Sequence, residues 1–207
     1  MLVRINEDTI RDGDIQTVVN CLKDGGVIIY PTDTVYALGC DIYNTKAIEK
    51  LCRLKGIKPE KSNFSFVCSD LSHLSSFTTA IPNPVFRLMK KALPGPYTFI
   101  LEASSQVPKL LKQNKKTVGI RVPDNKICKA IVETLGHPII STSLHDTSDE
   151  ILEYFSDPEL IHRQYSDQVD MVVDGGFGNI YPSTIIDCST DEFKVLREGI
   201  GDLSILN

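Results

Sequence analysis

The chain has 207 residues, of which 42% are hydrophobic and 24% are charged. These fractions are typical of a globular protein and exclude the disordered and collagen-like classes. The formal net charge of −5 is unevenly distributed: residues 46–130 hold sixteen Lys and Arg against five Asp and Glu, a net +11, so the remainder carries −16. A basic centre within an acidic chain predicts a surface or cleft that meets an anion.

The first residues lack the apolar core of a signal peptide, and no later run approaches the ~20 apolar residues of a membrane span. The six cysteines lie at least 12 positions apart, which excludes a CxxC redox pair and a zinc knuckle. Most of them sit in apolar runs, where small buried thiols are expected. We therefore expect a cytoplasmic protein with reduced cysteines.

Taken in chain order, the hydrophobic periodicity predicts alternating helices and strands. Helices are predicted at 9–24, 45–54, 83–93, 125–136 and within the acidic region 147–165. Strands are predicted at 27–31, 63–69, 97–103, 116–123, 137–143, 170–176, 183–189 and 192–198. Two of these strands, 27–31 and 137–143, are apolar on both faces and need helices on either side. The pattern predicts one α/β domain around a mixed, twisted sheet.

Polar side chains follow the first buried strand. Thr32, Asp33, Thr34 and Tyr36 lie in the segment PTDTVYALGCD, at the carboxyl end of that strand. Open α/β sheets bind their ligands at this edge, and three small hydrogen-bonding groups with a tyrosine suit a polar small molecule. The alternative is a Pro-Thr-Asp turn that caps the following segment.

Two further strands end in polar groups. Arg121 lies in an otherwise Val/Ile strand, where its guanidinium either grips a carboxylate or phosphate in bidentate fashion or points to solvent. Ser141, Thr142 and Ser143 lie at the carboxyl end of the strand at 137–143 and can donate hydroxyls to the same kinds of anion. Their neighbours His145 and Asp146 do not indicate a hydrolase, because the G-x-S-x-G elbow is missing.

The segment DGGFGNIYPSTIID at 174–187 is glycine-rich but has neither the Gly-Lys-Ser/Thr ending of a P-loop nor a G-x-G-x-x-G pattern. Ser183 and Thr184 enter the next strand as a second hydroxyl pair, and Arg197 precedes a glycine turn. The first interpretation of the basic segments within 46–130 is that they form the solvated faces of amphipathic helices. Phosphate contacts from such a face would also bind double-stranded RNA.

The chain resembles the YrdC/YciO family, the threonylcarbamoyl-AMP synthase superfamily, in six segments that occur in the same order: GGVIIYPTDTVYALGCD, LPGPYTFIL, GIRVPDN, PIISTS, PSTIID and VLREG. NFSFVCSDLSHLS and STSLHDTSDE are closer to its YciO branch than to its YrdC branch. The resemblance implies one YrdC-like domain over 1–207, with a core of about 10–200. Its twisted mixed sheet would be flanked by helices and carry a basic concave cavity.

The resemblance also implies a chemistry. Members of the YrdC branch are nucleotidyltransferases that make threonylcarbamoyl-AMP from L-threonine, bicarbonate and ATP, and the product serves tRNA modification. By position, the residues expected to bind threonine are Thr34, Arg121, Ser141 and Ser183. Those expected to bind the nucleotide are Lys55, Lys58, Ser143 and Arg197. ATP would arrive with Mg²⁺ as a substrate, without a tightly bound metal site in the protein.

Two motifs depart from the synthase pattern. The run LKGIKPEKSN replaces a Lys-x-Arg-Pro signature, and His145 stands where an asparagine would follow Ser143. Lysine does not replace a bidentate arginine, so both departures weaken the nucleotide half while the threonine half is intact. The sequence therefore favours a nucleotide-binding protein with weak or altered synthase activity. The alternatives are a tRNA or double-stranded RNA binding module without catalysis, and a paralogue that binds another phosphorylated metabolite.

Overall fold

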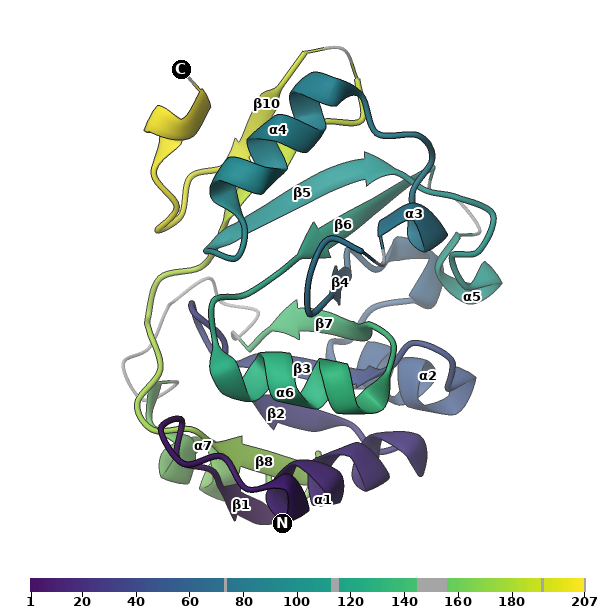
Figure 1. Cartoon of the computed structure of the whole chain (residues 1–207). Coiled ribbons are helices and arrows are strands. Elements are labelled where there is room, and N and C mark those ends of the chain that lie inside the picture. The colour runs from purple at the N-terminus through teal and green to yellow at the C-terminus, as the bar shows by residue number, and fades with distance from the viewer. Residues whose placement is uncertain (73, 113–115, 145–155, 191, 207) are drawn as a thin grey trace.

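The computed structural model describes residues 1–72, 74–112, 116–144, 156–190 and 192–206. In these residues ten strands form one mixed sheet in the order β1-β8-β2-β3-β7-β4-β6-β5-β9-β10, and the two termini lie at opposite ends of it (Figure 1). The strands are β1 (Leu2–Arg4), β2 (Ile28–Tyr30), β3 (Ala37–Asp41), β4 (Ser65–Val67), β5 (Tyr97–Glu102), β6 (Thr117–Arg121), β7 (Ile139–Ser143), β8 (Met171–Asp174), β9 (Thr184–Asp187) and β10 (Lys194–Arg197).

Helices cover both faces of the sheet, as predicted from the apolar central strands. They are α1 (Asp12–Lys23), α2 (Thr45–Leu54), α3 (Leu74–Phe77), α4 (Asn83–Ala92), α5 (Lys109–Lys112), α6 (Lys126–Leu135) and α7 (Pro158–Tyr165), with 3₁₀ turns η1 (Pro59–Lys61) and η3 (Leu203–Leu206). None of the helices in the described part of the chain is both long and apolar enough to span a membrane.

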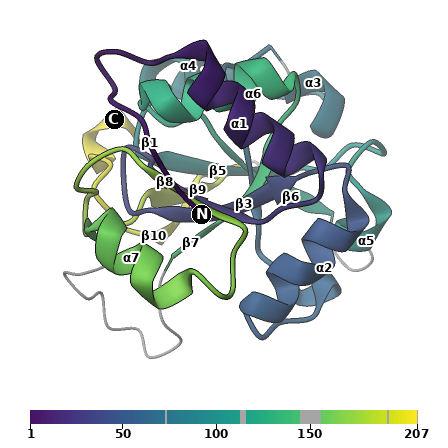
Figure 2. The ribbon, with the colours of Figure 1, turned by 90° about the horizontal axis from the view of Figure 1, so that it is seen from below.

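One row of side chains forms the core on the first face. It runs across five neighbouring strands: Cys40, Ile140, Phe66, Ile120 and Phe99. The apolar sides of α2 and α4 belong to the same buried cluster. Seen from below, α4 lies on the same side of the molecule as α1 and α6, and α2 lies on the other (Figure 2). The twist of the sheet thus carries one continuous face from one side of the molecule to the other.

The second face is apolar at one end and polar at the other. Ile139 and Val67 pack with α1 and α6. Two residues away from Ile139 and Val67, on β7 and β4, the side chains are small: Ser141 of β7 pairs with Ser65 of β4. Ser65 pairs in turn with Gly119 of β6. Because residues two apart in a strand share a face, this polar row continues the same surface. A hollow results where the core on this face ends.

The prediction missed two strands, β1 and β3. The segment 31–41 was expected to follow a strand as a ligand-binding segment, but its residues 37–41 form β3, which is buried and pairs antiparallel with both β2 and β7. Strand β1 was missed because it has only three residues. Within the acidic region 147–165, the described helix is α7, and residues 145–155 lie outside the described residues.

Local signals explain where α2 begins and ends. The Asn44 side chain accepts a hydrogen bond from the Ala47 N–H at 3.1 Å, which caps the first turn. At the other end, Gly56 has φ +63°, and the N–H of Ile57 donates to the Cys52 carbonyl at 3.0 Å. This is a Schellman ending, in which a glycine takes the left-handed position.

The cap of α2 gives a direct test of the fold. Asn44→Ala removes the acceptor of the Ala47 N–H, and we expect the free energy of unfolding to fall by about 1 kcal/mol. The melting temperature should fall by roughly 2–4 °C. The matched control is Asn44→Asp, which keeps the acceptor and adds a charge that the helix N-terminus favours. Equal melting temperatures for the two variants would contradict the assignment.

Candidate functional site

A cavity of about 290 Å³ opens on the polar part of the second face, over the neighbouring strands β7, β4, β6, β5, β9 and β10. Five of the eight predicted site residues line it: Arg121, Ser141, Ser143, Ser183 and Arg197. They come from β6, β7, the residue before β9, and β10. Residues separated by more than 70 positions along the chain therefore meet in one place.

Arg121 is the best-defined group of this cavity. Its guanidinium is buried and its Nη2 donates to the Asp33 carboxylate at 3.0 Å and to the Thr34 hydroxyl at 2.9 Å. Thr34 is not among the residues that line the cavity and is connected to it through this hydrogen bond to Arg121. The Nε atom of Arg121 is buried and has no hydrogen-bond partner among the described residues. A buried donor without a partner is costly, so this edge of the guanidinium is suited to an incoming acceptor.

Asp33 is held from two sides. One carboxylate oxygen accepts from Arg121, and the other accepts from the Asp124 N–H at 3.1 Å. Burial raises the pKa of Asp33, and the attraction of Arg121 acts in the opposite direction. The contacts tie the segment between β2 and β3 to the end of β6 and to the residues that precede α6. Asp33 thus fixes the orientation of Arg121.

Ser141 is positioned by a residue that the sequence analysis passed over. The buried hydroxyl of Tyr30 donates to Ser141 Oγ at 2.8 Å, and burial raises the pKa of Tyr30. The ring has room because residue 39 is a glycine: a Cβ there would lie 2.7 Å from Tyr30 Cε1. A tyrosine in a strand buried on both faces needs a partner for its hydroxyl, which is the signal that could have identified it.

Arg197 and Ser183 form the opposite wall. Arg197 donates through Nε and Nη2 to the Ser183 carbonyl at 3.0 and 2.8 Å, and through Nη2 to Ser183 Oγ at 3.1 Å. Ser183 Oγ also lies 2.9 Å from the hydroxyl of Thr98. Burial, and then the positive charge of Arg121, lower the pKa of Arg197. The two arginines therefore repel each other across the cavity, and an anion between them would relieve this repulsion.

The two predicted lysines differ in position. Lys55 follows α2, and its Nζ donates to the Ser143 carbonyl at 3.4 Å, which places it at the rim of the cavity. Lys58 precedes η1, is exposed, and is not among the residues that line the cavity. The substituted position His145 lies outside the described residues. Of the altered Lys-x-Arg run, Lys55 is the lysine that the structure brings to the site.

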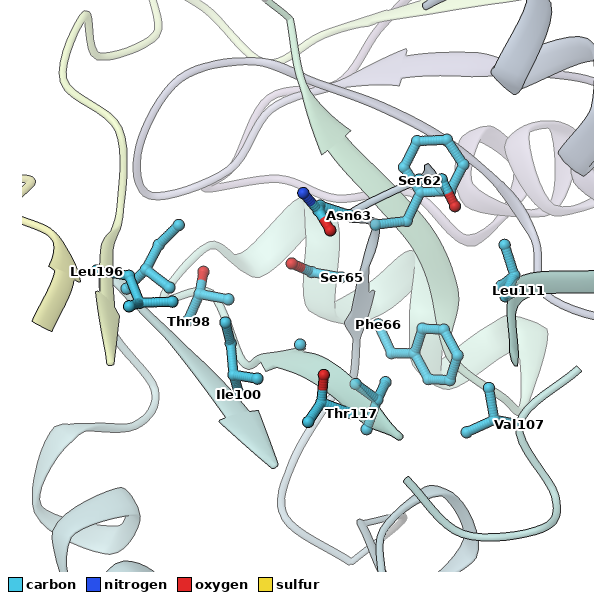
Figure 3. A pocket seen from close by; sticks show the side chains of 14 residues that line it. Ser62, Asn63, Ser65, Phe66, Thr98, Ile100, Val107, Leu111, Thr117 and Leu196 are labelled. Carbon is cyan, nitrogen blue, oxygen red and sulfur yellow. The ribbon is translucent and has the colours of Figure 1, made fainter. Parts of the chain in front are cut away.

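A second cavity of about 250 Å³ adjoins the first and shares Asn63, Ser65, Thr98 and Ile185 with it. Figure 3 shows Asn63, Ser65 and Thr98 between Leu196 on one side and Val107 and Leu111 on the other. Among the described residues, no charged side chain lines it. Gly119 keeps its floor open, because a Cβ there would lie 3.0 Å from Ser65 Oγ.

Most of the described Lys and Arg side chains of the basic block at 46–130 do not line either cavity. Among its described residues, Arg121 is the one cation that lines the two adjoining cavities, and Lys55 lies at the rim. Lys109 and Lys116 of the last basic segment are exposed, while 113–115 lie outside the described residues. The net +11 is therefore spread mainly over solvated surfaces, and RNA binding by those surfaces stays a prediction.

Comparisons with known proteins agree with this architecture. The family model described as "Sua5_yciO_yrdC: Telomere recombination" matches residues 20–199. The chain is 44% identical over 200 residues to the uncharacterized protein YciO of Escherichia coli strain K12, covering 96% of this chain and 95% of that one. It is 28% identical over 179 residues to the threonylcarbamoyl-AMP synthase of Coxiella burnetii strain RSA 493, covering 86% and 94%.

Two solved structures show the same fold. The crystal structure of E. coli YciO superposes with a TM-score of 0.91 at 43% identity and covers 99% of this chain and 98% of that chain. P. abyssi Sua5 complexed with L-threonine superposes with a TM-score of 0.86 at 24% identity and covers 96% of this chain and 57% of that chain. The predicted α/β fold, a mixed sheet flanked by helices, is confirmed.

The ion pair beneath the cavity can be tested by removing one charge. Asp33→Asn leaves the buried guanidinium of Arg121 without its counter-ion, and we expect a loss of about 3–5 kcal/mol in the free energy of unfolding. Millimolar sulfate should restore part of the melting temperature, because an anion can take the place of the carboxylate. The control is Asp124→Asn, an exposed neighbour, with an expected change within about 0.5 kcal/mol. Equal melting curves for Asp33→Asn and wild type would contradict this role.

Proposed function

The chain belongs to the Sua5/YciO/YrdC family, and on that premise we propose that its cavity binds L-threonine and an adenine nucleotide. We further propose that it makes L-threonylcarbamoyladenylate slowly from L-threonine, bicarbonate and ATP, as a step towards tRNA modification. One observation carries the proposal: Arg121, whose buried Nε has no hydrogen-bond partner among the described residues, lines a polar cavity whose other wall holds a second arginine. Arg121 is paired with the carboxylate of Asp33, and the positive charge of Arg197 on the other wall favours a bound anion.

The threonine carboxylate is proposed to bind Arg121. The Nη2 edge of Arg121 is held by Asp33 and Thr34, so its orientation is fixed before a ligand arrives. A carboxylate at the Nε edge would form a charge-assisted hydrogen bond, which is stronger than a neutral one. Because the guanidinium is already ordered, little conformational entropy is lost on binding.

The hydroxyls around the cavity are proposed to orient the amino acid. Ser141 Oγ accepts from Tyr30, so its own proton is available for an acceptor on the ligand. Ser183 Oγ accepts from Arg197 and contacts Thr98, and it can pass a hydrogen bond on in the same way. Such fixed donors suit the carboxylate and carbamate oxygens of a threonine adduct.

The phosphate is proposed to lie near Arg197, Ser143 and Lys55. Burial, and then the positive charge of Arg121, lower the pKa of Arg197, and an α-phosphate between the two arginines would offset their repulsion. Lys55 lies beside the carbonyl of Ser143, from where its ammonium can reach a phosphate oxygen. The Ser143 hydroxyl lines the same wall and adds a neutral donor.

The proposed reaction needs no nucleophile from the protein. The threonine amine combines with bicarbonate, loses water and becomes a carbamate. A carbamate oxygen then attacks the α-phosphorus of ATP, a new O–P bond forms, and the bond to the β-phosphate breaks to release pyrophosphate. The protein would contribute positioning and positive charge. Slow turnover is expected, because Lys55 is the one lysine of its run that the described structure brings to the cavity rim.

Pyrophosphate release tests the proposal. Purified protein with Mg²⁺, ATP, bicarbonate and L-threonine should release pyrophosphate in a threonine-dependent way. Arg121→Lys should lower the rate at least about tenfold, because lysine cannot replace the forked donor. The control is Arg87→Lys, an exposed arginine of the same basic block on α4, which should leave the rate unchanged. Threonine-independent release, or equal rates for the two variants, would contradict the proposed function.

A further inference from the structure

We infer that Tyr36 is a positioning residue of the proposed site: its hydroxyl holds the connection 175–183, between β8 and β9, which contacts Thr34 and ends on Ser183. The inference rests on the proposed function, since it adds a residue to the machinery that would bind L-threonine. The glycines of this connection match neither a P-loop nor a dinucleotide-binding pattern, and the contact with Tyr36 gives them a role.

The β8–β9 connection joins two distant parts of the sheet. Six strands lie between β8 and β9 in the sheet order, and the connection runs along one side of the molecule (Figure 1). Near its middle, the Asn179 N–H donates to the Thr34 carbonyl at 3.3 Å. Its last residue, Ser183, accepts from Arg197. One short segment therefore contacts the Arg121 side of the cavity, through Thr34, and forms part of the Arg197 side.

Tyr36 fixes the first part of this connection. The tyrosine is fully buried and directly precedes β3. Its hydroxyl donates to the Gly176 carbonyl at 2.7 Å and accepts from the Gly175 N–H at 3.2 Å. Burial raises the pKa of Tyr36, so the hydroxyl keeps the proton that it donates. The connection is therefore tied to the interior of the sheet at its first two residues.

The glycines allow this close contact. A Cβ on Gly178 would lie 2.7 Å from Tyr36 Cδ2, and a Cβ on Gly175 would lie 2.7 Å from Pro31 Cγ. Both distances are well below the optimal separation of about 3.5–4.0 Å between carbon atoms, so a side chain at either position would push the connection away. Gly176 has φ +91°, which glycine adopts without strain. The glycine pattern thus follows from close packing on Pro31 and Tyr36.

Tyr36 acts on the ligand through other residues, because it is not among those that line the cavity. Without its hydroxyl, the connection would be held less firmly, and Thr34 and Ser183 would lose part of their support. Two groups proposed to meet the phosphate, Lys55 and Ser143, come from the end of α2 and from β7 instead. Loss of the hydroxyl should therefore weaken the binding of L-threonine more than that of the nucleotide.

Calorimetric titrations of Tyr36→Phe with L-threonine, and separately with ATP and Mg²⁺, test the inference. The variant keeps the ring and removes only the hydroxyl. We expect the Kd for L-threonine to rise about fivefold, while the Kd for ATP stays close to that of the wild type. The matched control is Tyr97→Phe, which removes another buried tyrosine hydroxyl, one that donates to the Asp202 carbonyl at 3.0 Å. It should leave both constants unchanged.

A second variant displaces the connection without removing a hydrogen-bonding group. Gly178→Ala should also raise the Kd for L-threonine, and its control is Gly13→Ala on α1, where a Cβ would meet nothing within 4 Å. A wild-type Kd for L-threonine in Tyr36→Phe or Gly178→Ala, or an equal rise for ATP or in Tyr97→Phe, would overturn the inference and leave the proposed function standing. If the wild-type protein binds no L-threonine, the proposed function fails as well.

Discussion

The buried contact between Arg121 and Asp33 holds together the part of the molecule on which the proposed site depends. Arg121 ends β6, and Asp33 lies in the connection between β2 and β3, which are separated from β6 by two other strands. Because Asp33 also accepts from the Asp124 N–H, the contact fixes the loop, the strand end and the start of α6 together. It orients the guanidinium, whose Nε has no hydrogen-bond partner in the described part of the chain.

This arrangement explains why small residues gather around the cavity. Gly39 gives the Tyr30 ring the space to reach Ser141, and Gly119 keeps the floor open beside Ser65. A larger residue at either position would move a hydroxyl or fill the hollow. The core on the other face, formed by Phe66, Ile120 and Phe99, supplies the rigid support that a preorganised polar site needs.

The sequence predicted much of the fold and part of the site. Periodicity placed α2, α4 and α6 and the polar ends of β6 and β7, because these signals are local. It missed β3, which pairs with both β2 and β7, because the polar residues just before this strand resemble a loop. The pairing of Arg121 with Asp33 has no local signal either. The block of +11 predicted a surface or cleft that meets an anion, and this stays a prediction, because charge along a chain does not show which cations are buried and which are solvated.

A crystal structure of the protein with L-threonine tests the central claim most directly. The account predicts that the carboxylate of threonine lies within hydrogen-bonding distance of Arg121 Nε, with the Arg121–Asp33 contact retained and Ser141 within reach of the ligand. Density for threonine away from Arg121, or an Arg121 side chain that leaves Asp33 to bind elsewhere, would contradict it.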